Sequence, residues 1–119
     1  MAKCRQKRLE VILDNKDIFS IINILKNTGI LCFEFDPAKS LSNKKKHGID
    51  FVAAQSLWDD ANARFAEARF VDEQRFTVTG MIGEKYFTGA FTIRESAIRI
   101  ISVRRARRNE IEAYISRRV

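Results

Sequence analysis

The sequence predicts an α+β domain in which an antiparallel sheet of about four to five strands packs against two N-terminal helices and a C-terminal helix. Three observations support this prediction. Alternating apolar and polar residues cluster in the C-terminal half, apolar residues at helical spacing flank them, and 119 residues suffice for one ordinary core. The net charge of +7 and the pI of about 9.8 indicate a surface that favours polyanions.

The main boundary is expected near Cys32, so that residues 1–32 form an N-terminal extension and residues 33–119 the main domain. Apolar residues at helical spacing predict a short helix in the extension: Ile18, Ile21, Ile22 and Leu25. This helix would pack on the main domain or on a partner. A third alternative is that translation starts later and the stretch is dispensable.

Cysteine use and hydropathy favour a reducing, cytoplasmic location. The two cysteines, Cys4 and Cys32, lie far apart and resemble neither a disulfide framework nor a metal-ligand pair. The longest apolar stretch, 18–25, falls well short of the roughly 20 residues needed to span a bilayer. Charged residues interrupt any signal-peptide core, so we expect neither export nor contact with a membrane.

Helix signals are clear at the start of the main domain. A short strand is expected at 33–35, followed by a helix at 37–46, because Asp36 is a favoured N-cap and Pro37 a favoured first helical residue. Gly48 supplies the left-handed residue that commonly ends a helix.

The rest of the main domain contains a second helix, the sheet and a last helix. Asp50 can cap the second helix, whose inward residues would be Phe51, Ala54, Leu57 and Trp58. Strands are expected at 64–71, 75–82, 85–95 and 98–105, with a hairpin turn at Gly83-Glu84. Apolar residues within 110–115 mark the final amphipathic helix.

The last expected strand runs directly into a cluster of arginines. Strict alternation from Ile98 onward places Arg99 on one face with Arg105, and Ser102 on the other face with Arg104. Apolar residues on both sides would hold these side chains rigidly, and planar guanidinium groups suit bidentate contact with phosphate. The alternative is a solvated basic start of a helix.

The helix expected at 37–46 carries a second polar group. Lys39, Asn43 and Lys46 fall at i, i+4 and i+7, on one face that could grip a sugar-phosphate backbone. The alternative is a solvated helix end whose cations interact with the helix dipole. His47 is of the residue type that exchanges protons at neutral pH, although a lone histidine in this position is more often structural.

Metal, nucleotide and acyl-transfer chemistry are not indicated. One histidine and two remote cysteines cannot assemble the usual metal site, and no Gly-rich phosphate loop occurs, so no metal ligand and no cofactor are expected. Metal-free cleavage of RNA remains. In that reaction the 2′-hydroxyl attacks the neighbouring phosphorus, and lysine, arginine and histidine can move protons and stabilise charge.

Motifs spread over the whole main domain occur in a characteristic order: Phe33-Glu34-Phe35-Asp36-Pro37-Ala38-Lys39, Asn43, Lys46-His47-Gly48, Phe51, Ala54, Asp59, Arg75, Gly80, Arg99-Ile100-Ile101-Ser102, Arg104-Arg105-Ala106, Glu110 and Tyr114. Together they resemble the BrnT-type toxins. Members of that family usually begin near Phe33, so residues 1–32 inherit no function from the resemblance. The family more often has Trp at Phe35 and Phe at Trp58, and we expect both exchanges to affect packing alone.

The resemblance implies a RelE-like α+β fold and a small cytoplasmic bacterial ribonuclease of a type II toxin–antitoxin system. It implies RNA as substrate, a BrnA-type antitoxin as protein partner, and binding of promoter DNA only as the toxin–antitoxin complex. Carried over by position, the catalytic group comprises Lys46, His47, Arg75, Arg99 and Arg104, and the RNA-binding group comprises Lys39, Asn43, Ser102 and Arg105.

The resulting hypothesis is a metal-independent endoribonuclease toxin that cleaves RNA and arrests growth unless its antitoxin binds. His47 or Lys46 would handle a proton, and the transition state would be stabilised by Arg75, Arg99 and Arg104. Two alternatives stay open. One is a non-catalytic nucleic-acid-binding module, and the other is an antitoxin-binding protein of the same fold whose N-terminal helix masks the site. The hypothesis requires the cations to converge in one electropositive hollow.

Overall fold

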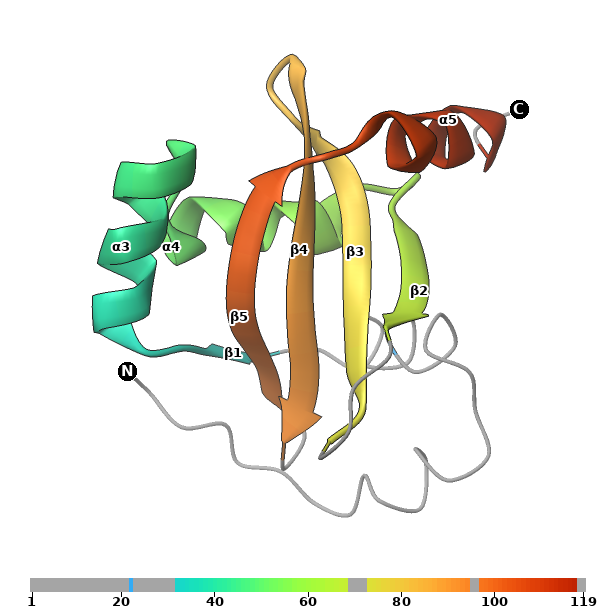
Figure 1. Ribbon diagram of the computed structural model, residues 1–119. Coiled ribbons are helices and arrows are strands. Elements are labelled where there is room, and N and C mark those ends of the chain that lie inside the picture. Colours follow the sequence, from blue (N-terminus) through green and yellow to red (C-terminus); the bar gives the residue numbers. More distant parts are fainter. Residues whose placement is uncertain (1–21, 23–31, 69–72, 95–96, 118–119) are drawn as a thin grey trace.

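A computed structural model of the chain describes residues 22, 32–68, 73–94 and 97–117. A five-stranded sheet runs through this part in the order β1-β5-β4-β3-β2 (Figure 1). The strands are β1 Cys32–Glu34, β2 Arg64–Ala68, β3 Arg75–Ile82, β4 Lys85–Arg94 and β5 Ala97–Arg105.

The sheet is mixed, whereas the sequence predicted an antiparallel one. Strands β2 to β5 pair antiparallel with their neighbours, but β1 pairs parallel to β5. No hairpin joins β1 to β5, because the helices α3, α4 and η1 and the strands β2, β3 and β4 lie between them in the chain, so the direction of β1 was not set by a local turn. The α+β class itself is confirmed.

The helices are α3 Pro37–His47, α4 Phe51–Ala54, the 3₁₀-helix η1 Gln55–Asp59 and α5 Arg108–Arg117. Helix α3 has the predicted caps. The Asp36 carboxylate accepts a hydrogen bond from the Ala38 amide at 2.9 Å, and Gly48, at φ 79°, ends the helix by donating to the Lys44 carbonyl at 2.9 Å. The second predicted helix has only one turn of α-helix before it tightens into η1.

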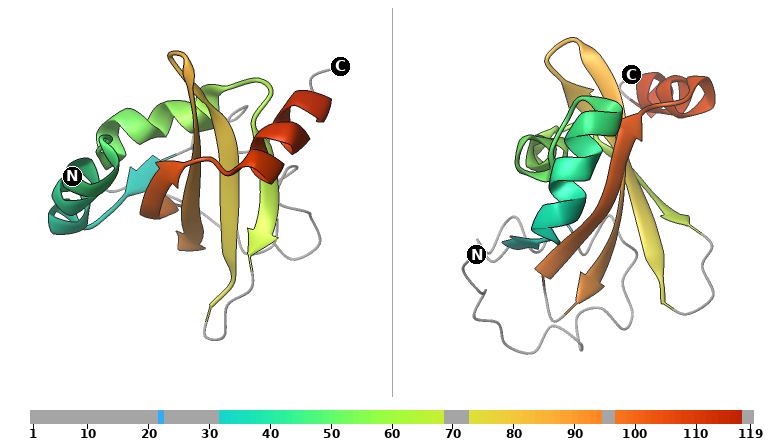
Figure 2. Two further views of the ribbon diagram at one scale, coloured as in Figure 1. Left: turned by 45° about the horizontal axis from the view of Figure 1, so that its top comes forward. Right: turned by 60° about the vertical axis from the view of Figure 1, so that its left-hand side comes forward.

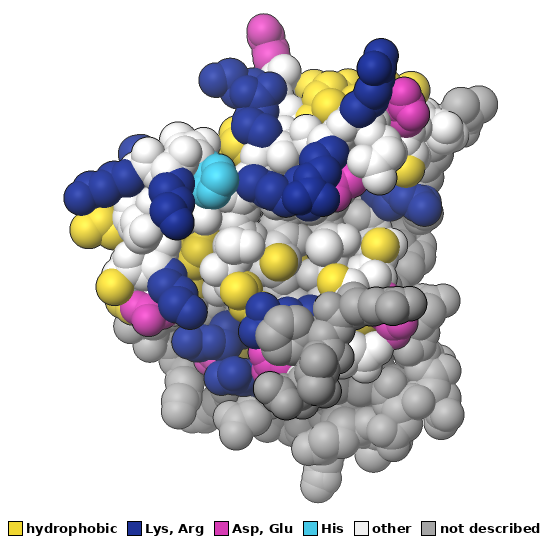
Figure 3. Space-filling model, in the orientation of Figure 1, with side chains coloured by type: hydrophobic (Ala, Val, Ile, Leu, Met, Phe, Trp, Pro, Cys, Tyr) yellow, Lys and Arg dark blue, Asp and Glu magenta, His cyan; other side chains and the backbone are white. Residues whose placement is uncertain are grey.

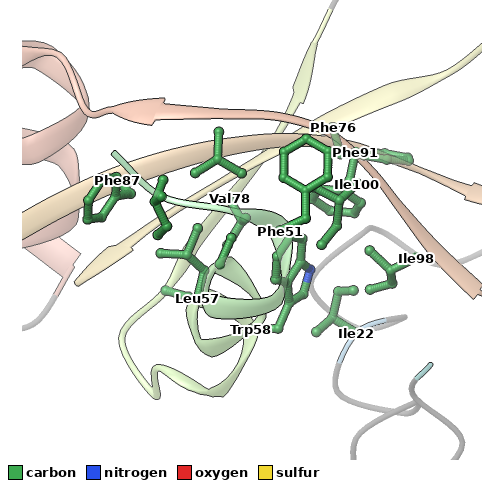
Figure 4. Close-up of a cluster of buried hydrophobic side chains, with 14 residues drawn as sticks. Ile22, Phe51, Leu57, Trp58, Phe76, Val78, Phe87, Phe91, Ile98 and Ile100 are labelled. Carbon is green, nitrogen blue, oxygen red and sulfur yellow. The ribbon is translucent and has the colours of Figure 1, made fainter. Parts of the chain in front are cut away.

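The hydrophobic core lies between the sheet and the α4–η1 segment (Figures 2 and 4). Trp58 is fully buried, and its ring packs edge-on against Phe33 and Phe91 with centroid distances of 5.1 and 5.2 Å. Among the described residues, no hydrogen-bond partner reaches the indole Nε1 of Trp58. Phe35 packs against Phe51 in the same edge-on way at 5.6 Å. Both aromatic side chains therefore contribute packing contacts to the core.

Ile22 belongs to this core. Its side chain is 1% exposed and lies in the same cluster as Trp58 and Ile98 (Figure 4). At this position the N-terminal extension packs on the main domain. The other members of the predicted N-terminal helix lie outside the described residues: Ile18, Ile21 and Leu25.

A β-bulge in β5 changes which side chains share a face. Neighbouring residues of β4 pair with Ile100 and then with Ser102, so Ile101 has no partner across the strand pair. After the bulge, Val103 returns to the core face with Ile100, and both are at most 2% exposed.

The expected grouping of the arginines was therefore wrong. Arg99, Ser102 and Arg104 lie on the face of the sheet away from the core, because the extra residue shifts the alternation by one position. Arg105 lies on the other face, where its guanidinium carbon is 5.7 Å from the centroid of the Phe87 ring.

Two features bear on the expected location. Cys32 is disulfide-bonded, which contradicts the expectation of no disulfide, since disulfide bonding cannot be deduced from cysteine spacing alone. In the part of the chain that the structure describes, no helix has both the length and the apolarity needed to cross a membrane.

Candidate nucleic-acid interface

The face of the sheet opposite α4 and η1, here called the open face, carries four of the nine predicted site residues: Arg75, Arg99, Ser102 and Arg104. Helix α3 lies beside β5 at one edge, and α5 lies across one end of β3 and β2 (Figure 1). Lysine and arginine side chains gather above and below a paler centre of this face (Figure 3). Cross-strand neighbours form this centre, and all have small side chains: Ser102, Ala90, Thr77 and Ala66.

The first group of cations, the Arg99 row, consists of Arg99 and Arg75 on either side of Thr92. Arg99 pairs with Thr92 directly. Arg75 lies on the other side of Thr92, because Phe76 pairs with Phe91 at the adjoining position. Two strand spacings separate the two arginine backbones, which is about 10 Å. Their side chains are 32% and 26% exposed, so both guanidinium groups lie against the sheet.

Each arginine of the Arg99 row has a carboxylate neighbour. Arg99 Nη1 is 3.3 Å from Glu34 Oε2, and Arg75 Nη2 is 3.2 Å from Glu73 Oε2. Glu73 also approaches Arg94 at 3.5 Å. Partly exposed pairs of this kind contribute about 0–1 kcal/mol, so a phosphate group can compete with them for the guanidinium donors.

The second group, the Arg104 row, contains the cross-strand neighbours Arg104, Thr88, Thr79 and Arg64. Thr88 and Thr92 are four positions apart in β4, so the two rows are about 13 Å apart at about 3.3 Å per residue. The open face is therefore bordered by two cationic rows that run across the strands.

Arg104 forms a bidentate ion pair with Glu110 of α5. Nη1 and Nη2 each lie 2.8 Å from a different carboxylate oxygen. The hydrogen bond from Arg104 is the largest influence on Glu110 and lowers its pKa to about 2, although burial opposes the change. The same bond raises the pKa of Arg104. Both groups remain charged at any physiological pH.

Asn43 does not point into the open face. Its amide nitrogen donates to the carbonyls of Ile49 and Val103, both at 2.9 Å, and its oxygen accepts the Val103 amide at 3.1 Å. The side chain is 6% exposed, and both of its amide hydrogens are used. The expectation that Asn43 contacts RNA is therefore corrected: it fastens α3 to β5.

The other predicted residues of α3 are exposed: Lys39, Lys46 and His47. His47 lies one turn beyond Asn43 on the same stripe of the helix, so the bond from Asn43 to Val103 places His47 near the end of β5. The chain's single histidine (cyan) is visible on this side of the molecule beside lysine and arginine side chains (Figure 3).

The predicted catalytic arginines thus share a face but do not meet at one point. Arg75 and Arg99 form one row, Arg104 lies in the other, and the C-terminal turn of α3 approaches the Arg104 end. The cations were expected to converge in one electropositive hollow, and the structure instead arranges the arginines in the Arg99 row and the Arg104 row. Glu110 was noted in the sequence without a role in the site. Its carboxylate accepts a hydrogen bond from the Arg107 amide at 2.8 Å, and this spacing of three residues was the available signal of a helix start.

The α4–η1 segment covers one face of the sheet, and arginines border the other. This arrangement defines the class: a small α+β protein with a cationic face suited to a polyanion. A family model described as the ribonuclease toxin BrnT of type II toxin–antitoxin systems matches residues 35–110, and the chain belongs to this family. The match spans both rows and Glu110, and it confirms the resemblance seen in the sequence. A comparison with curated proteins finds no match.

Proposed function

We propose that this chain is a metal-independent endoribonuclease toxin that cleaves RNA on the open face and is neutralised by a BrnA-type antitoxin. Family membership supports the ribonuclease toxin. The single observation that carries the site is the placement of two arginine rows on one face, about 13 Å apart, over a floor of small side chains. This arrangement suits a stretch of sugar-phosphate backbone rather than one isolated phosphate.

The scissile phosphate is placed at the Arg104 end, because the candidate proton carriers His47 and Lys46 lie there. The 2′-oxygen forms a bond to phosphorus as the 5′-oxygen leaves. His47 or Lys46 takes or supplies a proton, and Arg104 stabilises the charge that develops on the phosphoryl oxygens. The products are a 2′,3′-cyclic phosphate and a 5′-hydroxyl.

Arg99 and Arg75 are assigned to a neighbouring phosphate. The backbones of the two rows are about 13 Å apart, and a carboxylate neighbour holds each of these arginines, so we assign each row its own phosphate. Binding there would fix the register of the strand and reduce the freedom of the reacting nucleotides. Ser102 lies between the rows and can contact the ribose-phosphate chain, whereas Lys39 and Arg105 would attract RNA from outside the open face.

A non-catalytic nucleic-acid-binding module is the second candidate. The observation that favours it is that Arg75, Arg99 and Arg104 each have a carboxylate neighbour, which reduces the net positive charge available to a transition state. The same charges would then contact phosphates while no bond breaks.

Incubation of the purified protein with RNA in EDTA distinguishes the two. Cleavage that leaves 2′,3′-cyclic phosphate ends supports the toxin, and salt-sensitive binding of intact RNA supports the binding module. We expect Arg99→Ala and Arg104→Ala to reduce cleavage, the latter about a hundredfold or more. Arg108→Ala is the control, because this side chain is 91% exposed on α5. Expression of the variants in bacteria is a second test. If growth arrest persists unchanged in Arg99→Ala and in Arg104→Ala, these arginines have no part in the mechanism.

A further inference from the structure

The Glu110 carboxylate receives donors from strands β4 and β5 and from the segment that precedes α5. Oε2 accepts from Arg104 Nη2, and Oε1 accepts from Arg104 Nη1, the Thr88 hydroxyl at 3.0 Å and the Arg107 amide at 2.8 Å. The side chain is 20% exposed. Four donors on one carboxylate fix both its position and its rotation.

The hydroxyl chain beneath Glu110 has a defined direction. An ionised carboxylate only accepts, so Thr88 gives its single hydroxyl proton to Glu110. The 2.8 Å contact between the Thr79 and Thr88 hydroxyls must therefore be donated by Thr79. Both threonines are buried, at 4% and 2% exposure. Glu110 is thus anchored to the interior of the sheet rather than to the surface of α5.

Arg104 keeps one edge of its guanidinium group free. Arginine has five N–H donors in a plane. Two bind Glu110, and a third, on Nη1, lies 3.2 Å from the Arg105 carbonyl. The remaining two donors, on Nε and Nη2, share the edge opposite Nη1 and meet no acceptor among the described residues. Two parallel donors on one edge match the bidentate geometry of a phosphate.

We propose that Glu110 is a positioning residue that presents the Nε–Nη2 edge of Arg104 to an RNA phosphate on the open face. The inference rests on the proposed function, and Glu110 itself touches no substrate. Glu110 adds no positive charge to the site, so its own contribution is geometric: it holds the guanidinium group of Arg104 in place before RNA arrives.

The kinetic test is Glu110→Gln, which keeps the size of the side chain and removes its charge. We expect kcat for RNA cleavage to fall about 10- to 100-fold while KM changes less than about threefold, as for a misplaced transition-state donor. Glu112→Gln is the matched control, because Glu112 also lies on α5 and also pairs with an arginine, Arg108, but is 68% exposed. A wild-type kcat in Glu110→Gln, or a rise in KM alone, would overturn the inference.

Chemical rescue separates positioning from folding. With Arg104→Ala, added guanidinium ion at sub-denaturing concentration should restore part of the cleavage, because the Glu110 carboxylate, which Thr88 helps to hold in place, can still accept its hydrogen bonds. The double variant Arg104→Ala/Glu110→Gln should not be rescued. Equal rescue of both variants contradicts the role of Glu110.

A spectroscopic test does not depend on cleavage. The ¹H–¹⁵Nη signals of Arg104, whose protons Glu110 accepts, should be protected from exchange in the wild type and lose protection in Glu110→Gln. The ¹H–¹⁵Nε signal reports on the edge that faces RNA. Addition of a non-cleavable 2′-deoxy oligonucleotide should shift this signal in the wild type. A shift without any RNA cleavage would refute the proposed ribonuclease and keep the positioning role. A signal that does not shift when the oligonucleotide is added would overturn the positioning role.

Discussion

The side chain of Asn43 bonds both backbone groups of Val103, a residue 60 positions away in the sequence. Strand β1 pairs with β5 only over Ala97–Arg99, and among the described residues no strand lies along the edge of β5 beyond that point. The Asn43 carboxamide occupies this edge as a strand backbone would. This contact places the last turn of α3 beside the end of β5, where Arg104 crosses the open face.

Asn43→Ala should destabilise the protein without weakening a phosphate contact. The substitution leaves buried backbone groups of Ile49 and Val103 unpaired, which we expect to cost about 2–4 kcal/mol in urea unfolding. The salt dependence of RNA binding should keep its slope, because no cation is removed. The control is Ser42→Ala, an exposed neighbour. A weaker affinity of the folded Asn43→Ala protein for RNA at fixed salt, relative to Ser42→Ala, would indicate a direct RNA contact.

The Glu110 carboxylate should make the protein acid-sensitive. Its pKa in the folded protein is about 2, below the ordinary value of 4.5, so its stabilising contribution is fully present above pH 4.5 and is lost as the pH falls toward 2. Allowing for partial exposure, we expect a loss of about 1–2 kcal/mol over this window. Thermal unfolding measured at intervals from pH 6 to pH 2 checks this. In Glu110→Gln this loss of stability on acidification should be absent. If the stability of both proteins falls in parallel with pH, Glu110 is not its source.

Gly80→Ala should loosen the attachment of α5. A Cβ atom at Gly80 would lie 3.0 Å from Asp60 Oδ2, the oxygen that accepts from the Met81 amide at 3.0 Å and the Tyr114 hydroxyl at 2.8 Å. We expect a loss of about 1–3 kcal/mol in unfolding free energy. In Gly89→Ala the new atom meets its neighbours at 3.5–3.6 Å, so this control should lose less. If both variants lose the same unfolding free energy, the contact with Asp60 is not the cause of the loss in Gly80→Ala.

Ile22→Ala tests whether the N-terminal extension is part of the core. The fully buried side chain lies in the cluster with Trp58 and Ile98, and its truncation should lower the unfolding free energy by about 2–4 kcal/mol. Ile115→Ala, at a position 47% exposed, should change it by less than about 0.5 kcal/mol. Indistinguishable midpoints for the two variants in urea would mean that the extension contributes no packing.

Helix α3 and strands β3, β4 and β5 could be predicted because their signals are local. Asp36 and Gly48 cap α3 through contacts within a few residues, and the strand at 75–82 has the predicted limits. The second helix was overestimated, since apolar spacing does not distinguish an α-helix from the tighter 3₁₀ turn that Gln55–Asp59 adopts.

The sequence by itself determined the α+β class, the element order, the caps and the chemical character of the site, because each depends on residues close together in the chain. The tertiary structure decided the parallel pairing of β1, the bulge at Ile101 and the partners of Asn43 and Glu110. Register and long-range hydrogen bonds depend on which strand lies alongside, and a shift of one residue exchanges the two faces of a strand. That shift is the physical reason why Arg99 and Arg104 share the open face while Arg105 does not.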